Sequence, residues 1–228
     1  MTRRFSIIQL ALFGQIIVEA PALAAGGAHV VDDAAVETPG TCHAENWLTA
    51  ASSRSGVANI SPACTRIAWP NLELGGAYAH AWADGRGGSL ISLTPKLVLR
   101  SEDTGVGVGV AGSVSYGLGR SRLEAASLTV PVTVAASERI RLNFNIGWQW
   151  FRMTDSHDLF VGAQAEIGLN DKLNLMIEAF TRDKGNAGGQ LGLRWTPGKG
   201  NVDIDLLLGR YLDGATRNAI TLGITLRR

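Results

Sequence analysis

Alternation of apolar and polar residues runs through the last two thirds of the chain and is the strongest structural signal in it. Between residues 139 and 150, Ile, Leu, Phe and Trp occupy the even positions, whereas Arg, Asn, Gly and Gln occupy the odd positions. A pleated strand points alternate side chains to opposite faces, so this stretch predicts a β-strand. The same division recurs at 173–180, 202–209 and 220–227. The pattern predicts a sheet with one apolar face.

Short connectors rich in Asp, Asn, Gly and Pro divide this region into strands that are close enough to pair as antiparallel hairpins. A meander of strands must close on itself or leave two edges that invite aggregation. The sequence therefore predicts an all-β protein with a single closed antiparallel up-and-down transmembrane β-barrel of about ten short strands, eight or twelve being the alternatives. The predicted strands are approximately 72–83, 89–100, 105–117, 122–134, 139–151, 158–168, 172–182, 189–196, 201–211 and 218–227.

The polar face of these strands is unlike a surface that faces water. It carries many Ala, Gly, Ser and Thr residues, which suit the inside of a narrow barrel, and charges in strand interiors fall almost entirely on it. A charge at mid-bilayer on the lipid face costs about 2–4 kcal/mol, which explains this placement. The predicted lumen charges are Glu73, Lys96, Arg141, Glu166, Glu178, Arg194, Asp203, Asp205 and Arg227.

Aromatic residues gather near the ends of the predicted strands. If the strand at 72–83 runs outward from the periplasm, Trp69 and Trp195 fall at the inner ends and the others at the outer ends. Membrane barrels carry two such aromatic girdles at their interfaces. A soluble periplasmic barrel with these aromatics in its core is the alternative. The predicted girdle residues are Trp69, Tyr78, Trp82, Tyr116, Trp148, Trp150, Trp195 and Tyr211.

The first residues have the features of an export signal. Arg3 and Arg4 precede an apolar run, which is followed by the small-residue pattern Ala22-Leu23-Ala24. Cleavage is expected after Ala24. The run of about 14 residues is shorter than the roughly 20 that a membrane-spanning helix needs. We therefore expect residues 1–24 to be a cleaved signal peptide, residues 25–70 an N-terminal leader, and residues 71–228 the transmembrane barrel.

The leader contains the two cysteines of the chain, Cys42 and Cys64. Export to an oxidising compartment predicts a disulfide between them, worth about 3 kcal/mol on a chain-entropy estimate. Residues 44–52 could form one or two helical turns inside the disulfide loop. The sequence leaves open whether the leader plugs the barrel or forms a small periplasmic cap.

Charge and composition exclude some partners. Removal of residues 1–24 takes two basic and one acidic residue from totals of 21 and 20, so the mature chain is formally neutral. This balance gives no reason to expect nucleic acid as a partner. Charged residues make up 18% of the chain, a low share for a soluble surface.

Residues that could carry chemistry are few. Ser156, His157 and Asp158 are adjacent in a predicted loop, and a catalytic triad needs side chains that converge from different elements. Asp203 and Asp205 point the same way and could bind a cation, but pairing with Arg141, Arg194 or Arg227 satisfies them as well. The sequence predicts no catalytic residue, metal site or cofactor.

The C-terminal half contains Glu178-Ala179-Phe180, the run 189–195 (GQLGLRW) and the closing Ile220-Thr221-Leu222-Gly223. With these features, residues 71–227 resemble the outer-membrane barrels grouped as transporters near phenol-degradation (MetA-type) genes. The resemblance is one of pattern and implies a channel for small molecules. It carries over no functional residue.

The predicted function is a narrow channel or transporter for small molecules in the cell outer membrane, with membrane lipid as a partner. Arg122, Arg152 and Arg210 lie at outer strand ends, where guanidinium groups suit the phosphates of lipopolysaccharide. The alternative is a closed structural or surface-interaction barrel without transport. Lesser alternatives are a soluble periplasmic ligand-binding barrel and an outer-membrane lipid-modifying enzyme.

Overall fold

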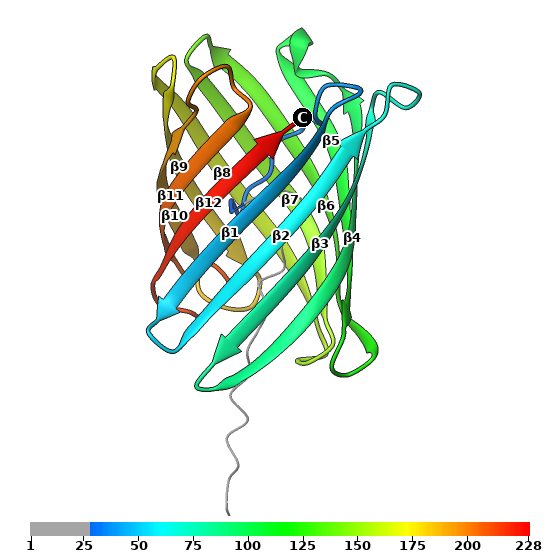
Figure 1. The fold of residues 1–228 in the computed structure, drawn as a ribbon, viewed down its shortest axis with the longest axis vertical. Coiled ribbons are helices and arrows are strands. Elements are labelled where there is room, and N and C mark those ends of the chain that lie inside the picture. The colour runs from blue at the N-terminus through cyan, green and yellow to red at the C-terminus, as the bar shows by residue number, and fades with distance from the viewer. Residues whose placement is uncertain (1–27) are drawn as a thin grey trace, which may run out of the picture.

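The computed structural model describes residues 28–228, which form one closed antiparallel barrel of twelve strands (Figure 1). Each strand pairs with its neighbours in the chain, and β1 pairs with β12 to close the barrel. The signal peptide predicted for residues 1–24 lies outside the described residues. In residues 28–228, no helix is long and apolar enough to cross a membrane.

The strands are joined by connectors of two to eight residues, and the connector between β4 and β5 contains a short 3₁₀ helix, η1. The elements are β1 (Cys42–Ser52), β2 (Ser55–Thr65), β3 (Leu72–Ala83), β4 (Arg86–Arg100), η1 (Glu102–Thr104), β5 (Val106–Gly117), β6 (Arg122–Ser137), β7 (Ile140–Phe151), β8 (Ser156–Asn170), β9 (Leu173–Arg182), β10 (Gly188–Trp195), β11 (Val202–Arg210) and β12 (Ala219–Arg227).

The predicted count of about ten strands is wrong, and twelve is the observed number. The two additional strands are β1 and β2, which lie in the region assigned to the N-terminal leader. Residues 44–52, expected as helical turns, are part of β1. The alternation of apolar and polar residues is weak there, because the apolar Trp47 faces the lumen and the polar Asn46 lies on the outward face. Two more strands widen a barrel, so this lumen has room for more than its own side chains.

The barrel is apolar outside and polar inside. Leu222 is 56% exposed, whereas the neighbouring Thr221 is 1% exposed and faces the lumen. Cross-strand pairing places Leu48, Leu222, Leu206 and Leu193 side by side on the outer wall. This row of leucines belongs to an apolar belt that faces outward, as in a barrel that meets lipid and unlike one with an apolar core.

The two ends of the barrel are distinguishable. At one end β1 begins and β12 ends, as the C-terminus at the top of Figure 1 shows. We call this the terminal end and the other the far end. Of the eight predicted girdle residues, Trp69 and Trp195 lie at the terminal end, and Tyr78, Trp82, Tyr116, Trp148, Trp150 and Tyr211 lie toward the far end.

Turn chemistry fixes the hairpins. Asp84 and Gly85 join β3 to β4 with φ of 48° and 77°, the pair of positive angles that a type I′ hairpin turn requires. Asp tolerates the left-handed region and Gly enters it freely, so an Asp-Gly pair predicts this turn.

The predicted disulfide is confirmed. Cys42 and Cys64 are directly paired residues of β1 and β2, with Cα atoms 4.1 Å apart. The bridge joins the first two strands at the terminal end, where the chain enters the sheet. It therefore fixes the point from which the preceding residues extend.

Outward orientation of the apolar face predicts a position-dependent cost of charge. Ile146 is 54% exposed at the middle of β7, and Ile140 is 39% exposed at its terminal end. In phospholipid vesicles, Ile146→Lys should lower the folding free energy by about 2–4 kcal/mol, and Ile140→Lys by about 1 kcal/mol or less. Urea titration of folding into vesicles measures both. Equal costs at the two positions would contradict a lipid-facing wall.

Loss of the disulfide should weaken the barrel without opening it. In Cys42→Ser/Cys64→Ser, the hydrogen bonds of β1 to β2 and β12 remain, so the strands stay paired. We expect the free energy of unfolding to fall by about 3 kcal/mol, because the unfolded chain gains the freedom of a loop that the bridge had closed. The urea midpoint, followed by tryptophan fluorescence in detergent, measures the change. The wild-type protein under reductant should show the same shift, and no shift there would contradict the prediction.

Candidate functional site

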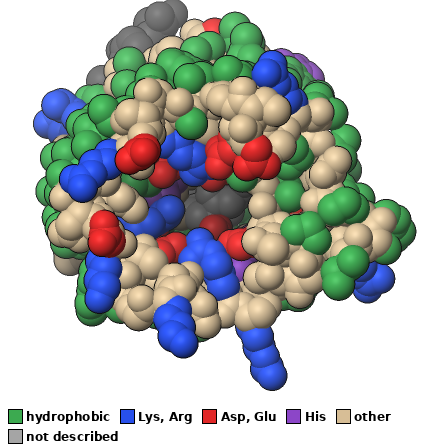
Figure 2. Space-filling model, turned by 90° about the horizontal axis from the view of Figure 1, so that it is seen from above, with side chains coloured by type: hydrophobic (Ala, Val, Ile, Leu, Met, Phe, Trp, Pro, Cys, Tyr) green, Lys and Arg blue, Asp and Glu red, His purple; other side chains and the backbone are tan. Residues whose placement is uncertain are grey.

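The nine predicted lumen charges all point into the barrel, and eight of them lie in its terminal half. Glu178, near the middle of β9, is the exception. Figure 2, which views the barrel from the terminal end, shows acidic and basic side chains around a central hollow. Charges of both signs therefore surround the mouth of the lumen at this end.

Some of these charges pair within the wall. Arg194 binds the Asp205 carboxylate with Nε at 2.8 Å and Nη2 at 3.1 Å. Arg227 contacts Asp203 at 2.7 Å. The two aspartates that could have formed a cation site are thus held by guanidinium groups. Arg141 does not pair with them, and contacts Glu102 of η1 at 2.8 Å and Glu166 at 3.6 Å.

The remaining charges bind a segment of the same chain. Residues 28–41, which we call the lumen segment, run inside the barrel before β1 begins, and Figure 1 shows part of them in blue within the wall. The segment starts beside Gln190 of β10, whose side-chain amide donates to the Ala28 carbonyl at 3.2 Å. It reaches the terminal end at Cys42, which exchanges two backbone hydrogen bonds with Arg228.

A turn at the terminal end redirects the lumen segment into β1. The Thr41 N–H donates to the Thr38 carbonyl at 2.9 Å, and Gly40 has a φ of 93°. Only Gly adopts that angle without steric cost, which explains its presence at this position. The Gly40 N–H donates to the Thr65 carbonyl at 2.7 Å, so β2 holds the turn in place.

Two adjacent carboxylates of the lumen segment bind wall cations. The Lys96 ammonium lies 2.9 Å from Asp32 Oδ1 and 3.0 Å from Asp33 Oδ1. The other carboxylate oxygen of Asp33 lies 3.2 Å from Arg141 Nη1. Nearer the terminal end, Arg227 Nε donates to Glu37 Oε1 at 2.6 Å. Charge-assisted hydrogen bonds of this kind are about twice as strong as neutral ones.

Polar side chains of the wall also bind the backbone of the lumen segment. Asn145 of β7 accepts from the Asp32 N–H at 2.8 Å and donates to the Asp32 carbonyl at 2.7 Å. Thr133 of β6 accepts from the Ala34 N–H at 2.8 Å. Glu73 of β3 accepts from the Glu37 N–H at 3.0 Å. Wall side chains thus replace the hydrogen bonds that a neighbouring strand would supply.

Glu178 binds the deepest part of the lumen segment. Its Oε2 accepts from the backbone N–H groups of Val30 at 3.0 Å and Val31 at 3.3 Å. Its Oε1 contacts His29 Nδ1 and accepts from Gln164 at 2.8 Å. A buried carboxylate needs several donors, and here most of them come from the segment.

One apolar contact accompanies these polar ones. Val31 packs with Phe160 and Phe180, which project into the lumen from β8 and β9. A Cβ on Gly162 would lie 2.7 Å from Val31, so the absence of a side chain there makes room for the segment. The aromatic side chains narrow the barrel at this level.

The sequence analysis missed several lumen residues. Asn145 and Thr133 stood on the polar face of predicted strands, and their inward parity was the available signal. Asp158 and Arg182 also face the lumen and are buried, but the predicted bounds put them at strand ends. Nothing in the pattern of the strands indicated that residues 28–37 would bind Asn145 and Thr133.

The structure does not bring Ser156, His157 and Asp158 together in a catalytic arrangement. Asp158 faces the lumen, whereas His157 stacks on Trp148 with ring centroids 5.7 Å apart on the outer wall. His80 stacks on Trp82 and bonds to Ser89. In residues 28–228, no group of three or more His, Cys, Asp or Glu side chains could hold a metal ion.

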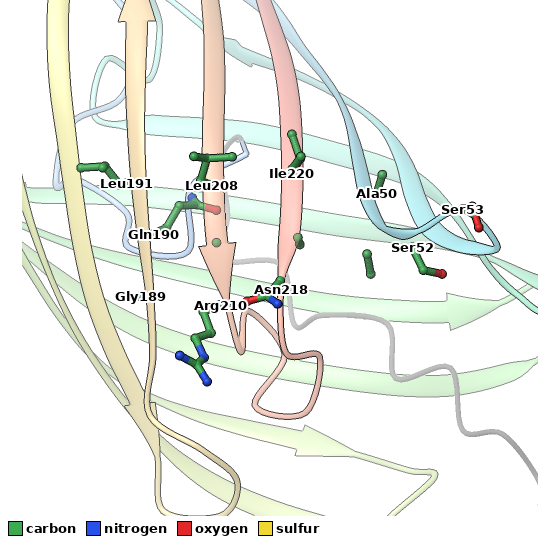
Figure 3. A pocket seen from close by; sticks show the side chains of 13 residues that line it. Ala50, Ser52, Ser53, Gly189, Gln190, Leu191, Leu208, Arg210, Asn218 and Ile220 are labelled. Carbon is green, nitrogen blue, oxygen red and sulfur yellow. The ribbon is translucent and has the colours of Figure 1, made fainter.

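A shallow concavity lies on the outer wall near the far end. It is lined by Leu191, Leu208, Ile220 and Ala50, which are aligned across four neighbouring strands, with Arg210 at its edge (Figure 3). The four aligned side chains belong to the apolar outer belt. Gln190, whose amide binds the Ala28 carbonyl in the lumen, also contributes to the lining of the concavity.

Comparison with known proteins places the chain in a sequence family. The family described as "Uncharacterised conserved protein UCP029691" matches residues 14–228. A search of curated proteins finds no match.

Solved structures with the same fold are outer-membrane porins and channels. The "KdgM porin" has a TM-score of 0.63 at 8% identity, over 82% of this chain and 98% of that chain. A "NanC porin" structure has a TM-score of 0.60 at 5% identity, over 81% and 98%. The "COG4313 outer membrane channel from Pseudomonas putida F1" has a TM-score of 0.63 at 13% identity, over 86% and 98%. At sequence identities this low, the similarity of the structures shows a shared fold alone.

Proposed function

The chain belongs to the family described as "Uncharacterised conserved protein UCP029691", and we propose that it is an outer-membrane channel for small molecules whose lumen is occupied by residues 28–41. The observation that carries this proposal is the contrast between an apolar outer belt and a lumen lined by charged and amide side chains. A barrel that met water outside and held an apolar core would have the opposite orientation.

The fold of the neighbours supports the proposal. KdgM, one of the porins with this fold, has also been solved in complex with disordered oligogalacturonate. The sequence resemblance to the MetA-type barrels implies the same general role. A cargo of small polar molecules fits a lumen with both signs of charge.

A closed structural or surface-interaction barrel is the second candidate. The lumen segment, together with Phe160, Phe180, Met176 and Leu207, fills part of the interior. In a closed barrel of this kind, the lumen segment would never leave the lumen. The two candidates differ in whether weakening the segment's contacts opens a path for ions.

The conductance of planar bilayers tests the proposal. Asp32→Asn/Asp33→Asn removes the carboxylates that bind Lys96 and Arg141. A hydrogen bond to a charged group contributes about 1.5–3 kcal/mol, so we expect the fraction of open channels to rise about tenfold or more. The control Asp155→Asn/Asp171→Asn removes the same charge from two turns, one at each end of the barrel, and should leave the conductance unchanged. Absence of conductance from both the wild-type protein and the Asp32/Asp33 variant would contradict a channel.

Lipopolysaccharide is the proposed lipid partner at the far end. Arg122, Arg152 and Arg210 lie at far ends of strands, and two of them sit over aromatic rings: Arg152 at 5.4 Å from the Trp150 centroid and Arg210 at 5.2 Å from that of Tyr211. Such contacts hold guanidinium groups at the interface, where phosphates of lipid head groups lie.

Substitution of these three arginines by Gln should reduce the lipopolysaccharide that co-purifies with the protein, because phosphate loses its cationic partners. The amount bound per barrel is measured by mass spectrometry of the purified protein. The control Arg66→Gln/Arg139→Gln/Lys199→Gln removes three charges from turns at the terminal end. An equal loss from both variants would argue against a specific site.

A further inference from the structure

The carboxylate of Asp33 occupies a site with a cation on each of its oxygens. Oδ1 lies 3.0 Å from Lys96 Nζ, and Oδ2 lies 3.2 Å from Arg141 Nη1. The two cations come from β4 and β7, so the rigid wall sets their separation. Asp32 adds a second carboxylate on Lys96 at 2.9 Å. The lumen segment thus stands where a free dicarboxylate would fit.

Lys96 depends on the lumen segment for its charge partners. Among the described residues, both carboxylates that pair with it belong to that segment. Glu73 faces Lys96 in the register of β3 and β4, but its carboxylate accepts from the Glu37 N–H at 3.0 Å and the Thr65 hydroxyl at 3.4 Å. The Lys96 side chain is 7% exposed, and a buried ammonium requires a partner. An anion must therefore replace the segment at Lys96, unless Glu73 or the nearby Glu45 turns toward it.

The site has an approach from the terminal end. Arg141 lines a polar pocket there, together with Glu102, Glu166 and residues of the adjoining turns. The Arg141 side chain is 26% exposed. An anion that enters the pocket meets Arg141 before it reaches Lys96.

The lumen segment competes with any solute as a tethered ligand. It is fixed to the wall at Cys42 by the disulfide and the hydrogen bonds to Arg228. A short tether gives an effective concentration in the millimolar range, so a free anion of similar affinity displaces the segment only at about millimolar concentration or above.

We infer that Lys96 and Arg141 form a binding site for carboxylate-bearing solutes, and that such a solute opens the lumen by displacing Asp32 and Asp33. The inference rests on the proposed channel function and names its substrate class. It makes the lumen segment a gate that responds to the solute to be carried.

Proteolysis at Glu37 reports the position of the gate without requiring conduction. Glu37 is held by Arg227 and by Glu73 when the segment is docked, so a glutamyl endopeptidase should cut after it slowly. The probe is succinate, added to the folded protein in detergent at constant ionic strength, with its neutral diamide as control. We expect cleavage after Glu37 to become about fivefold faster at tens of millimolar succinate and to stay constant in the diamide. Mass spectrometry of the released peptide measures the rate.

Three variants test the assignment of the site. Lys96→Gln removes the shared cation, so cleavage should be fast without succinate and insensitive to it. Glu73→Gln removes a wall carboxylate that could take the place of the solute, so less succinate should be needed. Lys199→Gln, in the turn between β10 and β11 at the same end, should behave as the wild-type protein. Because Glu73→Gln retains both cations, it keeps the test informative if Lys96→Gln fails to fold.

The outcomes separate the inference from the proposed function. Cleavage that accelerates with succinate in the wild-type protein but not in Lys96→Gln supports the site, even if bilayers show no current. Conductance combined with a cleavage rate that ignores succinate overturns the inference and leaves the channel. An equal response to succinate in the wild-type protein and Lys96→Gln overturns the assignment to Lys96.

Discussion

The hydrogen-bonded seam between β1 and β12 is the constraint on which the rest of the structure depends. An apolar bilayer offers no partner to free N–H and C=O groups, so a spanning sheet must close. The register from His43 paired with Arg227 to Ala50 paired with Ile220 achieves this closure. It also fixes Cys42 at the terminal end. Residues 28–41, which precede Cys42, therefore lie in the lumen and leave it at that end.

Closure also determines where charge can go. Side chains of successive strand residues point alternately to the outer wall and to the lumen. Charge is costly on the part of the outer wall that faces lipid, so the ionisable side chains in strand interiors lie mainly in the lumen. There they need partners. Arg194 with Asp205 and Arg227 with Asp203 pair across neighbouring strands, but Lys96 and Glu178 find their partners mainly in the lumen segment. The segment therefore completes the electrostatics of a wall that the strands leave unbalanced.

Ten of the twelve strands and the orientation of their faces could be predicted from the sequence, because period-two alternation persists where one face meets lipid. β1 and β2 could not, since Trp47 faces inward and small residues such as Ala44, Ala58 and Ala63 carry no contrast. The inward charges followed from parity alone. Their partners did not, because Asp33 and Lys96 are 63 residues apart in sequence and meet only through the curvature of the closed sheet.

The chemistry that holds the lumen segment suits release more than permanent closure. Val31, with Val30 packed beside it, enters the cluster of Phe160 and Phe180, whereas most other contacts of the segment are hydrogen bonds and ion pairs that water and solute ions can replace. At the terminal end of the segment, by contrast, Cys42 is held by a disulfide and by the hydrogen bonds of β1 to β2, and neither responds to dissolved anions. A segment held by a disulfide and a β-ladder at Cys42 but by ion pairs and hydrogen bonds along its length is the arrangement that the proposed gate requires.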